Sequence, residues 1–279
     1  MDADELLKRY AAGERDFRHA ELQGVSLLGV DLSQANLRGA NLSQANLTGS
    51  SLEGINLREA NLSQANLRGT NLREANLIGS HLNQTNLSES NLSDANLRTS
   101  NLNGANLSGT NLTDAILSEA MLRDADLSRA KLIDASLSRA NLSKTLLIGA
   151  MLEGANLTNA ILMEANLKGA NLAKALLHGA NFTRSDLTQV DLSRTKMSGT
   201  NMTDAILTGA NLRGASVSWT TLRGANLTKA NLYRAKLCWS NLTEAILVEA
   251  VLLDANLNQV MLRGANLSGA IMPNGSHHE

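Results

Sequence analysis

The sequence is poor in cysteine, proline and aromatic residues, and these shortages limit what the protein can be. Of 279 residues, one is cysteine (Cys238), one is proline, and aromatic residues make up 2%. A single cysteine cannot form an intramolecular disulfide, so the fold does not depend on an oxidising compartment. The few aromatic residues also supply no continuous track of rings for a strand of nucleobases.

The sequence also lacks a strong charge imbalance and long apolar runs. Its net charge is −1, which gives no global reason to expect a nucleic-acid or membrane partner. No apolar run approaches the ~20 residues of a membrane span, and no basic segment followed by an apolar one opens the sequence. We therefore expect a soluble, cytoplasmic protein.

What the sequence has in abundance is a repeat of five residues. The segment 20–274 divides into 51 blocks without insertion, whose positions we call a to e. Position c is leucine in 46 blocks, position a is always Ala, Ser, Thr, Val or Ile, and position e holds 19 of the 21 glycines. Neither one helix nor one strand can keep such leucines on a single face, because the period is neither 3.6 nor 2. The chain must therefore turn within every block.

The pattern predicts which positions point inward and how many blocks make one coil. Positions a and c are two apart, so on an extended segment they face the same way, and glycine at e suits a tight corner. A twenty-residue echo is superimposed on the period of five. "ANLSQANL" begins at Ala40 and again at Ala60, and Trp219 and Trp239 follow the same step. Four blocks per coil explain this echo, and we number the four sides zero to three from the block of Leu22.

The motif "ANLRGANLSQANLTG", residues 35–49, resembles the pentapeptide-repeat family, whose signature is A(D/N)LxX. The resemblance covers 20–274 and implies an all-β fold, a right-handed quadrilateral β-helix, which here would have about 12–13 coils at four blocks per coil. The opening "ELLKRYAAGERDF" and the closing "AIMPNGS" also resemble cyanobacterial members, including one linked to heterocyst differentiation.

The two ends of the sequence differ. We expect 1–19 to form a capping helix and entry, with a helix over 3–12, followed by the β-helix at 20–274 and a tail without assigned structure at 275–279. Outward positions in the last coils are unusually apolar, and such patches often mark interfaces. This pattern predicts a homodimer, although outward β-branched residues can simply favour strand. The predicted dimer interface comprises Tyr233, Val251, Leu253 and Ile271.

No arrangement in the sequence indicates catalysis, a cofactor or a metal. His81 and His178 fall on different sides and about four coils apart, and Cys238 lies about three coils beyond His178, so no nucleophile meets a base. The acidic row Glu74, Asp94, Asp114 and Asp134 follows automatically from the twenty-residue step. We therefore predict that the protein is not an enzyme and binds no cofactor or metal.

The near-neutral chain contains one basic segment. Residues 168–239 hold ten basic and three acidic residues, a net charge of +7. Both tryptophans occupy position e of side three, and basic residues line the opposite edge of that side. The two indoles could simply stack on each other, but arginine beside tryptophan is typical of interface hot spots. The predicted partner-binding residues are Arg194, Lys196, Trp219, Arg234, Lys236 and Trp239.

These patterns favour a protein–protein interaction scaffold that binds an acidic partner protein on this face. Such a scaffold could have a regulatory role. Nucleic-acid binding through 168–239 is the first alternative, because lysine and arginine beside aromatic rings can also hold bases. DNA mimicry of the topoisomerase-inhibitor type, which the family resemblance implies for some members, is the second. It calls for a strongly acidic surface, whereas this chain has a net charge of −1.

Overall fold

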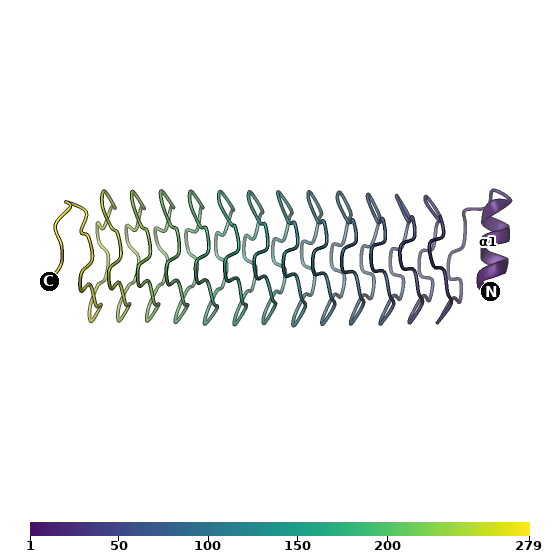
Figure 1. Cartoon of the computed structure of the whole chain (residues 1–279), viewed down its shortest axis with the longest axis horizontal. Coiled ribbons are helices and arrows are strands. Elements are labelled where there is room, and N and C mark those ends of the chain that lie inside the picture. The colour runs from purple at the N-terminus through teal and green to yellow at the C-terminus, as the bar shows by residue number, and fades with distance from the viewer. The chain divides into compact units, whose positions relative to one another are not determined.

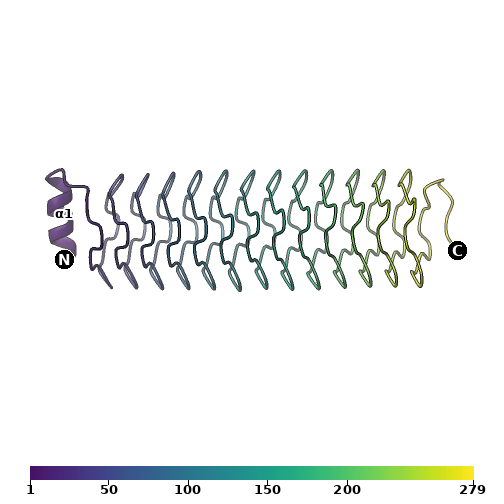
Figure 2. The same cartoon turned by 180° about the vertical axis from the view of Figure 1, so that it is seen from behind.

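A computed structural model describes residues 1–279, in two compact units, Met1–Asn141 and Leu142–Glu279. The one helix is α1, Ala3–Ala11, and the remaining chain winds through coils joined by single-residue bridges rather than long strands. Within each unit, successive coils lie side by side (Figure 1), and the view from behind agrees (Figure 2). The structure contains no helix with the length and apolar character needed to cross a membrane.

The bridges confirm the predicted step of twenty residues. Each side contributes one parallel bridge at position b, as between Asn41 and Asn61 in the first unit and between Asn211 and Asn231 in the second. The leucine at position c then donates its N–H to the carbonyl of b in the next coil, for example from Leu42 to Asn61 at 2.7 Å. A coil therefore has four sides of five residues.

The core is a stack of leucines and small residues, as positions a and c predicted. The central side chains from Leu22 to Leu252 are at most 1% exposed, and the alanines at position a are nearly all as deeply buried. Serine and threonine at position a donate their hydroxyl groups to backbone carbonyls, as Thr70 does to Leu47 at 2.9 Å and Ser240 to Val217 at 2.6 Å. No buried side-chain polar atom is left without a partner, so these hydroxyls do not penalise the core.

The corners explain the glycines. From Gly24 to Gly269, every e residue has a φ between 54° and 73°. In most blocks the a residue donates its N–H to the preceding c carbonyl, as Ala40 does to Leu37 at 3.0 Å. A positive φ at the third residue is the mark of a type II turn, which glycine adopts without strain. Asparagine at position b has a recurrent local role, because its Oδ1 accepts the N–H of position d, as Asn46 accepts from Thr48.

Helix α1 covers the first coil, as predicted. Asp2 caps its start by accepting the N–H of Glu5 at 2.8 Å, and Leu6 is fully buried. The hydroxyl group of Tyr10 donates to the carbonyl of Ser33 at 2.9 Å and so ties the helix to the coils. After the helix, an ion pair joins Arg9 to Glu14, and its hydrogen bonds hold the pKa of the Glu14 carboxyl below its usual value.

The last coils differ from the others in two ways. Leu257, Leu262 and Leu267 occupy the central position but are only partly buried, because no further coil packs on them. The tail is also structured. Its backbone turns back so that Ile271 and His277 form an antiparallel bridge, and the His278 N–H donates to Ala270 at 2.9 Å. The tail segment 273–279 therefore pairs with the last coil instead of standing apart from it.

Candidate interaction face

The two tryptophans form a stacked pair at one corner of side three. Their ring centroids are 5.2 Å apart and their planes differ by 5°, which is the arrangement that mutual stacking predicts. Stacking nevertheless leaves both residues accessible, since Trp219 is 63% exposed and Trp239 is 51% exposed. The pair is therefore a rigid apolar surface that remains open to solvent.

Local geometry sets the direction in which the indoles point. Side chains at position e lean toward the next coil. The glycines at e show this: a Cβ atom built on Gly214 would contact the side chain of Arg194, which lies twenty residues earlier, and one built on Gly264 would contact Glu244. Trp219 follows this rule and lies against Trp239. The corner thus orders the first indole on the second before any partner binds.

Half of the cations in 168–239 are paired with acids that lie outside that segment. The acids come from 153–164 and 244–254, each close to its partner in a neighbouring coil. Exposed pairs of this kind add little stability, but they remove charge from the surface. The five pairs are Lys174–Glu153 at 2.7 Å, Arg184–Glu164 at 3.7 Å, Arg223–Glu244 at 3.7 Å, Lys229–Glu249 at 3.5 Å and Arg234–Asp254 at 3.2 Å.

Three cations without an acidic partner lie along side three, toward the edge opposite the indoles. Of the four predicted cations, Arg234 is paired with Asp254, whereas Arg194, Lys196 and Lys236 are exposed and form no ion pair. Lys196 and Lys236 lie on side three with the indoles and Arg194 at its opposite edge, whereas Arg234 is taken up by its ion pair. We call the surface formed by Arg194, Lys196, Trp219, Lys236 and Trp239 the indole–cation face.

Tyr233 is held by two arginines rather than left open. The guanidinium carbons of Arg213 and Arg234 lie 5.0 Å and 4.8 Å from its ring centroid, which is cation–π geometry. This contact explains a tyrosine at an outward position without a second copy of the chain. The same contact engages Arg213, which is one of the cations of 168–239 without an acidic partner.

The other predicted dimer residues are partly buried. Val251, Leu253 and Ile271 share one side of the last coils, and Ile271 carries the bridge to the tail. A Cβ atom placed on Gly275 would lie 3.8 Å from Leu253, so the tail also shields that leucine. The homodimer itself stays a prediction.

The remaining polar groups are dispersed. Cys238 is a half-buried free thiol beside Trp239, and no group of three or more His, Cys, Asp or Glu side chains is placed to hold a metal ion. The acidic row of the first unit is partly neutralised, because Arg73 pairs with Glu74 and reaches Asp94 at 4.0 Å.

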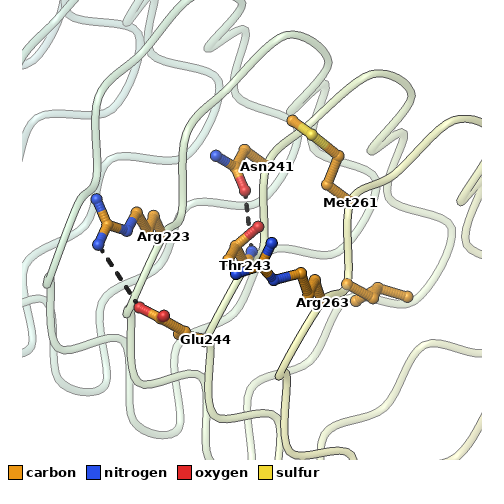
Figure 3. A pocket seen from close by; sticks show the side chains of 7 residues that line it. Arg223, Asn241, Thr243, Glu244, Met261 and Arg263 are labelled. Carbon is orange, nitrogen blue, oxygen red and sulfur yellow. Dashed lines mark hydrogen bonds and ion pairs between the residues drawn. The ribbon is translucent and has the colours of Figure 1, made fainter.

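A surface pocket of about 600 Å³ lies around the corner from the indoles, on side zero. Figure 3 shows Arg223 directed to Glu244, and Asn241 accepting from the Thr243 N–H at 3.0 Å. Sequence reasoning missed this pocket because the block of Leu262 has the same inward pattern as the blocks whose leucines are covered. The pocket is lined by Arg223, Asn241, Thr243, Glu244, Met261, Leu262 and Arg263.

The fold is a solenoid built from five-residue repeats, and comparisons with known proteins agree with that class. The family model described as pentapeptide repeats matches in eight copies, at 16–54, 55–94, 90–129, 125–163, 165–204, 205–243 and 239–272 among them. The chain belongs to the pentapeptide repeat family. No curated protein matches it.

Several solved structures are similar to the chain. HetL, a pentapeptide repeat protein involved in heterocyst differentiation regulation from Nostoc sp. strain PCC 7120, is 32% identical, with 100% of each chain covered and a TM-score of 0.32. The protein alr5209 from Nostoc PCC 7120 is 40% identical over 36% of this chain and 80% of its own, with a TM-score of 0.34. QnrB1, a plasmid-mediated fluoroquinolone resistance protein, is 21% identical over 68% of this chain and 88% of its own, with a TM-score of 0.35.

Proposed function

We propose that this protein is a non-enzymatic interaction scaffold that binds an acidic partner protein on the indole–cation face. One observation carries the proposal. Five cations of the basic segment are paired with acids, whereas Arg194, Lys196 and Lys236 are unpaired on the side that carries an exposed indole stack. Folding stability gains little from such an arrangement, because like charges along a column repel and exposed rings bury little apolar area.

The chemistry of the face suits protein binding. A large ring that is already ordered by its neighbour loses little conformational entropy on binding, so Trp219 and Trp239 can act as an anchor. The unpaired cations would attract carboxylates and set the partner's orientation, mainly through the association rate. Arg234, which pairs with Asp254, would contribute only at the edge of the contact.

Charge neutralisation favours a protein over the first alternative, nucleic acid. The net charge of +7 on residues 168–239 was the reason to consider nucleic acid, and acids of the adjoining coils reduce it. Two stacked rings also offer no continuous track for bases. DNA mimicry has less support, because the acidic row shares Arg73 and the whole chain has a net charge of −1. HetL is involved in heterocyst differentiation regulation, and its identity over the full chain supports a regulatory form of binding here.

The test is a binding measurement with matched variants. A partner is first captured from a lysate and purified, and its Kd is then measured with the unmodified protein and with Trp219→Ala. We expect a loss of about 2 kcal/mol, or roughly 30-fold in Kd, which is typical of a hot-spot residue. Lys196→Glu combined with Lys236→Glu should slow association. Lys168→Glu is the control, because Lys168 is also exposed and unpaired but lies on side one.

The outcome separates the alternatives. Unchanged affinity in the tryptophan and lysine variants, with circular dichroism showing an intact fold, would contradict the proposal. A parallel titration with single-stranded DNA measures the salt dependence of binding. Tight binding with a steep slope against salt would favour nucleic acid.

A further inference from the structure

The column of e residues on side three contains a gap directly before the indoles. Going along the second unit, the column reads Asn159, Gly179, Gly199, Trp219 and Trp239. Two successive glycines therefore leave two coils without a side chain of their own at this corner. The space over Gly179 is nevertheless filled, because the Asn159 amide leans over it. At Gly199 no atom lies within 4 Å of the place where a Cβ would be.

The same lean leaves one face of Trp219 open. Side chains at e point toward the following coil, so Trp219 turns its other face to Trp239 and leaves the face toward Gly199 uncovered. Neither Gly179 nor Gly199 has a side chain that could cover that face. The greater exposure of Trp219, 63% against 51% for Trp239, fits a ring that is covered on one side only.

The spacing of the coils suits a planar group stacked on Trp219. Successive coils are separated by ~4.8 Å, the usual spacing of paired backbones, and the two indole centroids are 5.2 Å apart. A ring placed one coil before Trp219 would continue the stack at about the same separation, which lies in the range of favourable aromatic pairs, ~4.5–7 Å.

The charges around the slot indicate which residues should flank the aromatic ring. Lys196 belongs to the same block as Gly199, and Arg194 lies at the opposite corner of side three; both are exposed without an acidic partner. A neutral or cationic aromatic ligand would leave these charges unused, whereas neighbouring carboxylates would pair with them. The face therefore favours a ring that is flanked by acids.

Resting on the proposed function, we infer that the gap over Gly199 is a slot for one aromatic side chain of the partner protein, from a segment in which that residue is flanked by Asp or Glu. The aromatic ring stacks on the free face of Trp219 while the adjacent carboxylates pair with Lys196 and Arg194. Binding in this mode converts a stack of two rings into a stack of three.

The test fills the slot without touching the indoles or the cations. Gly199→Gln places a side chain in the gap, and glutamine already occupies position e at Gln189 and Gln259 with a positive φ. Gly169→Gln is the matched control. Gly169 is also an e residue with nothing within 4 Å of its Cβ position, but it lies on side one. Both variants should unfold at the same temperature, which shows that any difference in binding arises from the slot.

The probe is a fluorescently labelled peptide, Asp-Glu-Tyr-Glu-Asp, whose binding is followed by anisotropy up to millimolar protein. We expect the affinity for this peptide to fall at least tenfold when its tyrosine is replaced by leucine. The affinity should also fall at least tenfold in the Gly199→Gln protein and stay unchanged in Gly169→Gln. A tenfold change corresponds to about 1.4 kcal/mol. The same titration with single-stranded oligothymidylate tests whether a nucleobase takes the slot instead.

Each result decides the inference separately from the proposed function. Equal affinity of Gly199→Gln and Gly169→Gln for the tyrosine peptide overturns the slot, and so does failure of the unmodified protein to bind that peptide. Preferential, Gly199-dependent binding of oligothymidylate overturns the protein segment as occupant. In all three cases the proposed function still stands or fails on the affinity of Trp219→Ala for the purified partner.

Discussion

The same substitution at two neighbouring central positions should have very different effects on stability. Leu242 and Leu262 occupy position c of side zero in successive coils, but Leu242 is fully buried and Leu262 is partly exposed to the pocket on side zero. Leucine to alanine removes three carbon atoms, worth ~2.4 kcal/mol of transfer free energy when they are fully buried. A residual cavity of roughly 50 Å³ adds about 1.2 kcal/mol.

These terms predict that Leu242→Ala lowers the free energy of unfolding by about 3.5 kcal/mol. At Leu262 the side chain already contacts solvent and its removal leaves no closed cavity, so we expect a loss of about 1 kcal/mol. The expected difference of about 2.5 kcal/mol is larger than the uncertainty of each term.

Urea unfolding followed by far-ultraviolet circular dichroism and by tryptophan fluorescence measures both variants. The unfolding curves from the two signals should coincide. If an end coil unfolded separately, unfolding would not be two-state and a single free energy of unfolding could not be defined. Equal losses for Leu242→Ala and Leu262→Ala, with equal urea dependence, would refute the reasoning that packing between coils sets the stability of the central position.

Two further predictions concern the indoles and the last coils. A double-mutant cycle with Trp219→Ala and Trp239→Ala should give a coupling free energy of about 0.5–1.5 kcal/mol in urea unfolding, as expected for a stacked pair, and a coupling of zero would mean that the rings do not stack in solution. If the homodimer forms, sedimentation should give twice the chain mass, and Val251→Asp with Leu253→Lys should halve it, whereas a monomer at tens of micromolar excludes the dimer.

The architecture of the coils follows from the sequence because it depends on local rules repeated many times. An apolar residue at every fifth position, a small residue two before it and glycine at the corner determine the turn, and the twenty-residue echo determines the number of sides. The bridge between Asn41 and Asn61 and the burial of Leu42 confirm that reasoning. The helix predicted over 3–12 is found at Ala3–Ala11.

The ends and the surface charges were harder to predict, because they depend on contacts that no repeat imposes. The pairing of Ile271 with His277 required the tail to turn back, which the segment "PNGSHHE" does not indicate by itself. The pairing of Arg234 with Asp254 follows from a spacing of twenty residues and could have been found by comparing each cation with the next coil. The slot at Gly199 depends on the direction in which side chains lean, which sequence alone does not specify.

The step of twenty residues determines which changes in chain length this surface can tolerate. Loss of one five-residue block between Lys196 and Trp219 would keep every leucine inward, since the inward pattern repeats in each block. It would also rotate all later residues by one side and carry both indoles away from Lys196. Loss of four blocks would restore the alignment while shortening the stack by one coil. Deletions in this chain thus fall into two kinds, those that preserve only the fold and those that also preserve its outward columns.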